Sequence, residues 1–141
     1  MADTLKTLEN LVKLAKKNVE DLQKQIAETV AAIAHLSQQI QTLENTIDRE
    51  AKAAGLEPFL LATFDKFKQK TEKDIKKHHA QRQELMHHEA ALRNQLAEEF
   101  ATQKRYEILL ERKMLEKRKR IEKSQQTQLD EIAATTHQQK Q

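Results

Sequence analysis

The sequence predicts an all-α fold, a long antiparallel two-helix coiled coil (αα-hairpin) with a frayed C-terminal tail. An apolar stripe at coiled-coil spacing runs through the first third of the chain, and the 141 residues include one Gly and one Pro. Because turns need Gly and Pro, the chain changes direction very few times. A third of the residues are charged and 4% are aromatic. The buried surface is therefore a thin zipper and not a globular core.

The first helix is expected over about residues 4–54. Its apolar stripe, the seam, steps by alternating three and four residues, and twelve of its thirteen positions are apolar. The seam consists of Leu5, Leu8, Val12, Ala15, Val19, Leu22, Ile26, Thr29, Ile33, Leu36, Ile40, Leu43 and Ile47. This spacing of 3.5 residues keeps the stripe against a partner helix only if the two helices wind around each other. Asp3 and Thr4 are candidate N-cap residues.

A single turn at residues 55–58 is expected to separate the two helices. Gly55 can take the left-handed conformation that ends a helix, and Pro58 suits the first turn of the next one. So short a connection makes the helices antiparallel. The second helix is expected over about residues 59–136, with polar residues at some seam positions and fraying from Ser124 onward.

The second helix should overhang the first. If both helices rise equally from the turn, Leu5 lies beside residues near 108. The overhang begins with residues 106–115, whose apolar side chains occupy more than one helix face. A second apolar face beyond the reach of the partner helix indicates contact with another protein.

Basic residues concentrate near the end of the second helix. They are Arg112, Lys113, Lys117, Arg118, Lys119, Arg120 and Lys123. This cluster fits a solvated helix supported by i,i+4 pairs, an acidic protein surface, or nucleic acid. The lack of aromatic residues around it counts against single-stranded nucleic acid.

Three of the four phenylalanines gather beside the turn, at positions 59, 64 and 67, together with Leu60 and Leu61. One interpretation is a hydrophobic plug that closes the end of the hairpin. The other is an exposed patch that docks onto a partner, since aromatic residues anchor interfaces. The two can hold together.

Catalytic, metal and cofactor sites are not expected. The pairs His78-His79 and His87-His88 do not share a helix face at i,i+3 or i,i+4, so they cannot assemble a closed metal site. The chain has no Cys, no Gly-rich phosphate loop and no nucleophile elbow, and we expect no enzyme. With no apolar run long enough to span a bilayer and no signal-peptide pattern, we expect a cytoplasmic protein.

Four features of the sequence together resemble a known family. They are the opening Leu5–Ala15, the stretch Phe64–Phe67 followed by Glu72-Lys73, Ile75 and His78, the run Leu109–Arg112 with basic residues after it, and Asp130-Glu131. The chain thereby resembles the bacterial flagellar export protein FliJ and the YscO-like stalk proteins of injectisome type III secretion. The resemblance covers essentially the whole chain.

The resemblance implies a non-enzymatic central stalk. In this family the end carrying both termini inserts into a hexameric export ATPase and promotes ring assembly and activity. The tip near the turn contacts the cytoplasmic domain of the export gate at the inner membrane, and some members bind export chaperones. The implied gate-binding residues are Phe64, Phe67, Ile75 and His78. The implied ATPase-binding residues are Leu5, Leu8, Leu11, Lys16, Leu110, Arg112, Lys113, Lys117 and Arg120. Thr71 and Asp74 depart from the family pattern, which has apolar residues there.

Two alternatives remain open from the residues themselves. The seam of the first helix is compatible with a parallel two-stranded coil, so the chain could be a homodimeric scaffold or tether. The second alternative is a basic coiled coil that binds nucleic acid. The sequence does not decide between a flagellar apparatus and an injectisome, but the terminal stretches match the flagellar version better.

Overall fold

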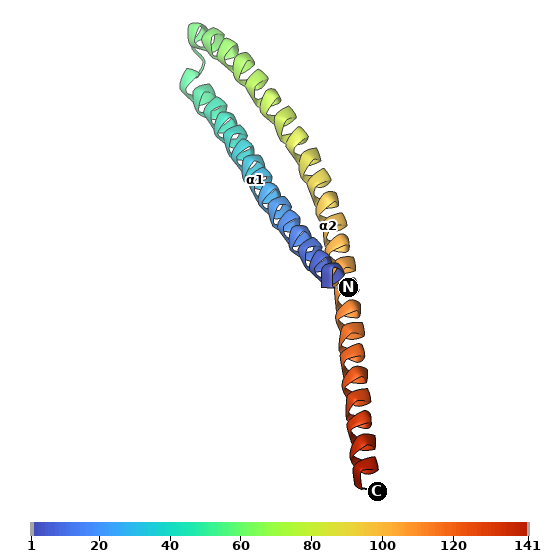
Figure 1. Cartoon of the computed structure of the whole chain (residues 1–141). Helices are drawn as coiled ribbons and strands as arrows, with labels where there is room; N and C mark the ends of the chain where they lie inside the picture. Colours follow the sequence, from blue (N-terminus) through green and yellow to red (C-terminus); the bar gives the residue numbers. More distant parts are fainter. Residues whose placement is uncertain (1, 141) are drawn as a thin grey trace. The chain divides into compact units, whose positions relative to one another are not determined.

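The computed structural model describes residues 2–140 and is a helical hairpin (Figure 1). Helix α1 spans Ala2–Ala54 and helix α2 spans Pro58–Lys140, with no strand among the described residues. The predicted all-α class is confirmed. Contacts divide the chain into two units, Met1–Val19 with Glu98–Gln141 and Glu20–Ala97. We call them the termini unit and the turn unit.

The turn forms as the Gly and Pro positions predict. Gly55 has a φ of 59°, in the left-handed region, and Pro58 is the first residue of α2. Glu57 caps α2: its carboxylate accepts from the backbone N–H of Leu60 at 2.8 Å, and its carbonyl accepts from the N–H of Leu61 at 2.9 Å. These bonds use amides that have no partner within the helix. The role of Glu57 was not apparent from the sequence.

The seam of α1 is covered along its length. All thirteen predicted positions are buried or half-buried, with Ala15 and Ile40 among the most enclosed. Thr29, the polar member, is buried because its hydroxyl donates to the carbonyl of Gln25 at 2.8 Å. Since a single chain provides this cover, the seam does not need a second copy of the chain.

The matching side of α2 is partly polar, as the sparse pattern predicted. Every seventh residue from 64 to 106 is buried or half-buried, and these residues are Phe64, Thr71, His78, Leu85, Leu92, Glu99 and Tyr106. Leu92 is 3% exposed and Thr71 is 5% exposed. Three of the seven are polar or charged, so α2 contributes less apolar area to the zipper than α1 does.

The register in the turn unit differs from the equal-rise estimate, which was wrong. The Nη1 of Arg82 donates to the Oγ of Ser37 at 3.1 Å, although Ser37 lies fewer residues from the turn than Arg82 does. The reason is that α2 starts beyond the end of α1, as Figure 1 shows at the turn, so its first residues have no partner on α1. Accordingly Phe59 is exposed.

Both helices extend beyond their predicted outer ends. Helix α1 begins at Ala2, so Asp3 and Thr4 lie inside its first turn and are not N-caps; the Asp3 carboxylate still favours the helix N-terminus. Helix α2 continues to Lys140 and includes the stretch expected to fray. That stretch has no Gly or Pro, and local bonds support it: Gln126 donates to Asp130 at 3.1 Å, and the Thr127 hydroxyl to the Lys123 carbonyl at 3.0 Å.

The left-handed Gly55 leads to the first prediction. Replacing Gly55 with Ala should lower the free energy of unfolding by about 1 kcal/mol, because L-residues are strained at positive φ. No atom lies within 4 Å of the added Cβ, so the loss reports backbone strain alone. Gly55→Asn should lose less, since Asn tolerates this conformation. Urea unfolding followed by circular dichroism measures both, and equal losses for Ala and Asn would contradict the assignment.

Candidate functional site

The turn carries an exposed apolar cluster, which we call the tip patch: Leu56, Phe59, Leu60 and Leu61. Leu56 is 93% exposed and Phe59 is 74% exposed. Both side chains protrude because α2 starts beyond the end of α1. An apolar cluster of this kind is typical of an interaction surface.

The other two phenylalanines near the turn point inward. Phe64 and Phe67 are half-buried and line a cavity of about 260 Å³ together with Ala53 and Ala54 of α1. The plug and the patch expected from the sequence are therefore both present, and Leu60 belongs to both because it also lines the cavity. The sequence could not separate them before the phase of α2 was known. Leu56 lies in the turn, where no helical period applies, so the sequence pattern does not indicate its exposure.

The four residues implied to bind the export gate lie on or beside the side of α2 that faces α1. Phe64, Phe67, Ile75 and His78 are each half-buried, so part of each side chain remains accessible. Thr71 is buried and Asp74 is half-buried on the same side. The two departures from the family pattern are thus polar residues in the zipper.

His78 lies in a groove of about 390 Å³. The groove is lined by His35, Gln38, Gln39, Thr42 and Leu43 of α1 and by His78 of α2. The Nδ1 atom of His78 is buried and makes no hydrogen bond within the described residues. One turn further on, Arg82 bonds to Ser37 and also to the Nδ1 of His79 at 3.0 Å. The zipper is polar and incompletely bonded here, whereas the apolar Leu92 further along α2 is buried.

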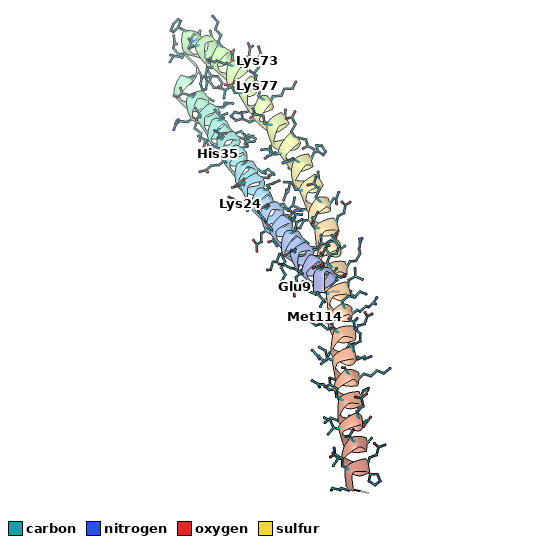
Figure 2. The ribbon with its side chains drawn as sticks, viewed as in Figure 1. Glu9, Lys24, His35, Lys73, Lys77 and Met114 are labelled. Carbon is teal, nitrogen blue, oxygen red and sulfur yellow. The ribbon has the colours of Figure 1, made fainter. Side chains whose placement is uncertain are left out.

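The termini unit contains a second groove, of about 430 Å³, which we call the termini groove. It is lined by Val12 and Lys16 of α1 and by Glu107, Leu110, Glu111, Met114, Leu115 and Arg118 of α2. Its floor is apolar and its rim carries both signs of charge. Two predicted ATPase-binding residues, Lys16 and Leu110, line it, whereas Leu5, Leu8 and Leu11 are buried or half-buried on α1. Figure 2 marks Met114 on this part of α2.

From Glu111 to Lys140, every described residue of α2 is exposed. The exposed apolar side chains of this stretch are Met114, Leu115, Ile121, Leu129 and Ile132. The predicted ATPase-binding cations Arg112, Lys113, Lys117 and Arg120 lie on the same stretch, and Lys113 pairs with Glu116 at 3.5 Å. The predicted second apolar face thus lies uncovered among positive charges. Met114 and Leu115, which join this face to the termini groove, were not in the predicted binding set.

The described residues contain neither a candidate metal site nor a candidate membrane span. No group of three or more His, Cys, Asp or Glu side chains is placed to hold a metal ion. Neither helix, in its described part, contains a segment long and apolar enough to cross a membrane.

Comparison with known proteins adds one finding. Residues 5–141 match a family model described as the flagellar FliJ protein, which is nearly the full length of the chain. Searches of curated proteins and of solved structures gave no significant match.

The separation of plug from patch leads to the second prediction. Phe67→Ala should destabilise the hairpin by about 1–2 kcal/mol, because it removes a half-buried ring from the cavity beside Ala54. Phe59→Ala is the matched control and should change stability by less than about 0.5 kcal/mol, since its ring is exposed. Thermal unfolding of the two variants measures the difference. Equal losses would mean that both rings pack in the hairpin.

Proposed function

The chain belongs to the flagellar FliJ protein family and is a component of the flagellar export apparatus, and we propose that it acts there as a non-enzymatic central stalk. Its termini unit inserts into a hexameric export ATPase and promotes ring assembly and ATP hydrolysis. Its tip contacts the cytoplasmic domain of the export gate. The protein is cytoplasmic and associates peripherally with the inner-membrane apparatus, and export chaperones are further candidate partners.

The observation that carries the ATPase contact is the uncovered apolar face of α2. Leu110, Met114 and Leu115 line the termini groove, and Ile121 continues the apolar surface along the same helix. These side chains lose contact with water only if another protein covers them. The surrounding Arg and Lys residues suit an acidic rim on that protein, and Arg is favoured at interfaces.

The gate contact is supported by the surface around the turn. Phe64, Phe67, Ile75 and His78 are partly accessible there. His78 is the member whose loss should least affect the fold, because its Nδ1 has no hydrogen-bond partner among the described residues. It is therefore the best position at which to separate gate binding from stability.

The two alternative functions have less support. The homodimeric scaffold needs the α1 seam to pair between chains, but α2 covers that seam within one chain. The hypothesis that the chain binds nucleic acid rests on the basic cluster alone. Glu111, Glu116 and Glu122 lie within that cluster and reduce its positive charge. Both alternatives predict no effect on an export ATPase.

The ATPase contact gives the third prediction. Adding the protein to its purified cognate export ATPase should stimulate hydrolysis and hexamer formation. Leu115→Asp should reduce this stimulation at least about tenfold, because it places a charge on the apolar floor of the groove. Phosphate release and analytical ultracentrifugation provide the two readouts.

Leu56→Asp is the control for this experiment. It introduces the same charge at an exposed apolar position of the turn unit and should leave stimulation unchanged. If the unmodified protein is a stable dimer that does not stimulate the ATPase, the stalk function is wrong. If Leu115→Asp and Leu56→Asp reduce the stimulation of the ATPase equally, the termini groove is not the contact surface.

The gate contact gives the fourth prediction. His78→Ala should weaken binding to the purified cytoplasmic domain of the export gate several-fold while leaving the melting temperature nearly unchanged. His87→Ala removes an equivalent side chain from an exposed site on α2 and should bind normally. Calorimetry of the three proteins tests this. Normal binding by a folded His78→Ala variant would exclude His78 from the contact.

A further inference from the structure

A row of lysines continues from the tip patch along one side of α2. At 100° per residue, Lys66, Lys70, Lys73 and Lys77 fall within about 60° of one another around the helix. All four are exposed, and Figure 2 labels Lys73 and Lys77 on the part of α2 near the turn. Phe59 falls inside the same angular range. One side of the helix therefore presents an aromatic ring followed by four positive charges, which we call the lysine row.

Between residues 59 and 81 no carboxylate falls within the angular range of the lysine row, and the nearest, Asp74, lies about 40° from Lys70 around the helix. The three acidic residues of that segment are Asp65, Glu72 and Asp74. Asp74 is half-buried on the side of α2 that faces α1, and Glu72 pairs with Lys68, which is outside the row, at 3.9 Å. Asp65 lies about 100° from Lys66 around the helix. The four lysines therefore give this side a net positive charge even with the Asp74 carboxylate one helical turn from Lys70 and Lys77.

From this arrangement we propose that the tip patch and the lysine row bind the surface of an anionic lipid bilayer. Phe59 and Leu56 would enter the boundary between headgroups and acyl chains while the four lysines contact the headgroups. Peripheral attachment to membranes needs two such signals, an apolar anchor and a polybasic surface, because one alone is weak. This inference does not depend on the ATPase contact.

The residue types favour lipid over an acidic protein surface. Protein interfaces are enriched in Arg and depleted in Lys, since the guanidinium group makes paired, directional hydrogen bonds. The segment from residue 59 to 81 contains six lysines and no arginine. The basic cluster of the termini unit, by contrast, mixes Lys with Arg112, Arg118 and Arg120. Attraction to anionic lipid requires only positive charge near the surface.

The fifth prediction tests the lysine row. The full-length protein should float with vesicles of phosphatidylcholine containing phosphatidylglycerol, and not with phosphatidylcholine alone. The combined substitutions Lys66→Gln, Lys70→Gln, Lys73→Gln and Lys77→Gln should weaken this binding several hundredfold, at about fivefold per lysine near the surface. The matched control replaces Lys6, Lys13, Lys17 and Lys24 by Gln, which changes the net charge equally. Those four exposed lysines also share a side of their helix, α1, but Glu20 lies among them.

The apolar anchor has its own readout, because the chain contains no Trp. Phe59→Trp should show a blue shift of its fluorescence on vesicles with phosphatidylglycerol, while Leu129→Trp, at an exposed site of the termini unit, should not. Equal vesicle binding by the two lysine variants, or no shift at position 59, would overturn the proposal. A third result would also overturn it: the unmodified protein does not bind vesicles, and the lysine-row variant no longer binds the purified gate domain. The lysine row would then be a binding surface for an acidic protein. ATPase stimulation, measured on the same variants, reports separately on the stalk function.

Discussion

The packing of the α1 seam against α2 is the interaction on which the rest of the structure depends. Each turn of the hairpin buries only a few side chains, and no large side chain among the described residues is completely enclosed. The stability of such a zipper comes from repeated small contacts along its length and not from a central core. A strong stripe on α1 allows α2 to carry Thr71, His78 and Glu99 at positions that a more symmetric coiled coil would fill with apolar residues.

Helix α2 distributes its apolar residues differently from α1. Several lie outside the zipper, at the tip patch around Phe59 and on the face that contains Met114, Leu115 and Ile121. Placed in the zipper, the same residues would have stabilised the hairpin more. Their positions instead put apolar surface in both units where a partner can reach it, which is the distribution expected of a connecting component. The polar stretch around His78 is consistent with this, since the buried Nδ1 of His78 has no hydrogen-bond partner among the described residues.

The seam of α1 could be predicted in full because its period of 3.5 residues is sustained through Ile47 without interruption. Gly55 and Pro58 likewise specify the turn through their backbone preferences alone. The register could not be predicted, because an equal rise from the turn ignores that α2 starts beyond the end of α1. The exposure of Phe59 and the packing of Phe67 could not be predicted either. The apolar stripe of α2 is irregular, so it does not show which side of α2 faces α1. Partner contacts depend on surfaces that the chain itself does not contain.

The uncovered part of α2 after Arg118 has a thermodynamic consequence of its own. With no second helix beside it, its helical order rests on local pairs such as Gln126 with Asp130, each contributing a few tenths of a kcal/mol. Its helix–coil equilibrium is therefore closer to balance than that of the paired part. A protein that grips this stretch must use some of its binding free energy to hold the helix. Substitutions that alter helix propensity, such as Ala133→Gly, then change the affinity of α2 for that protein without changing a contact between the two.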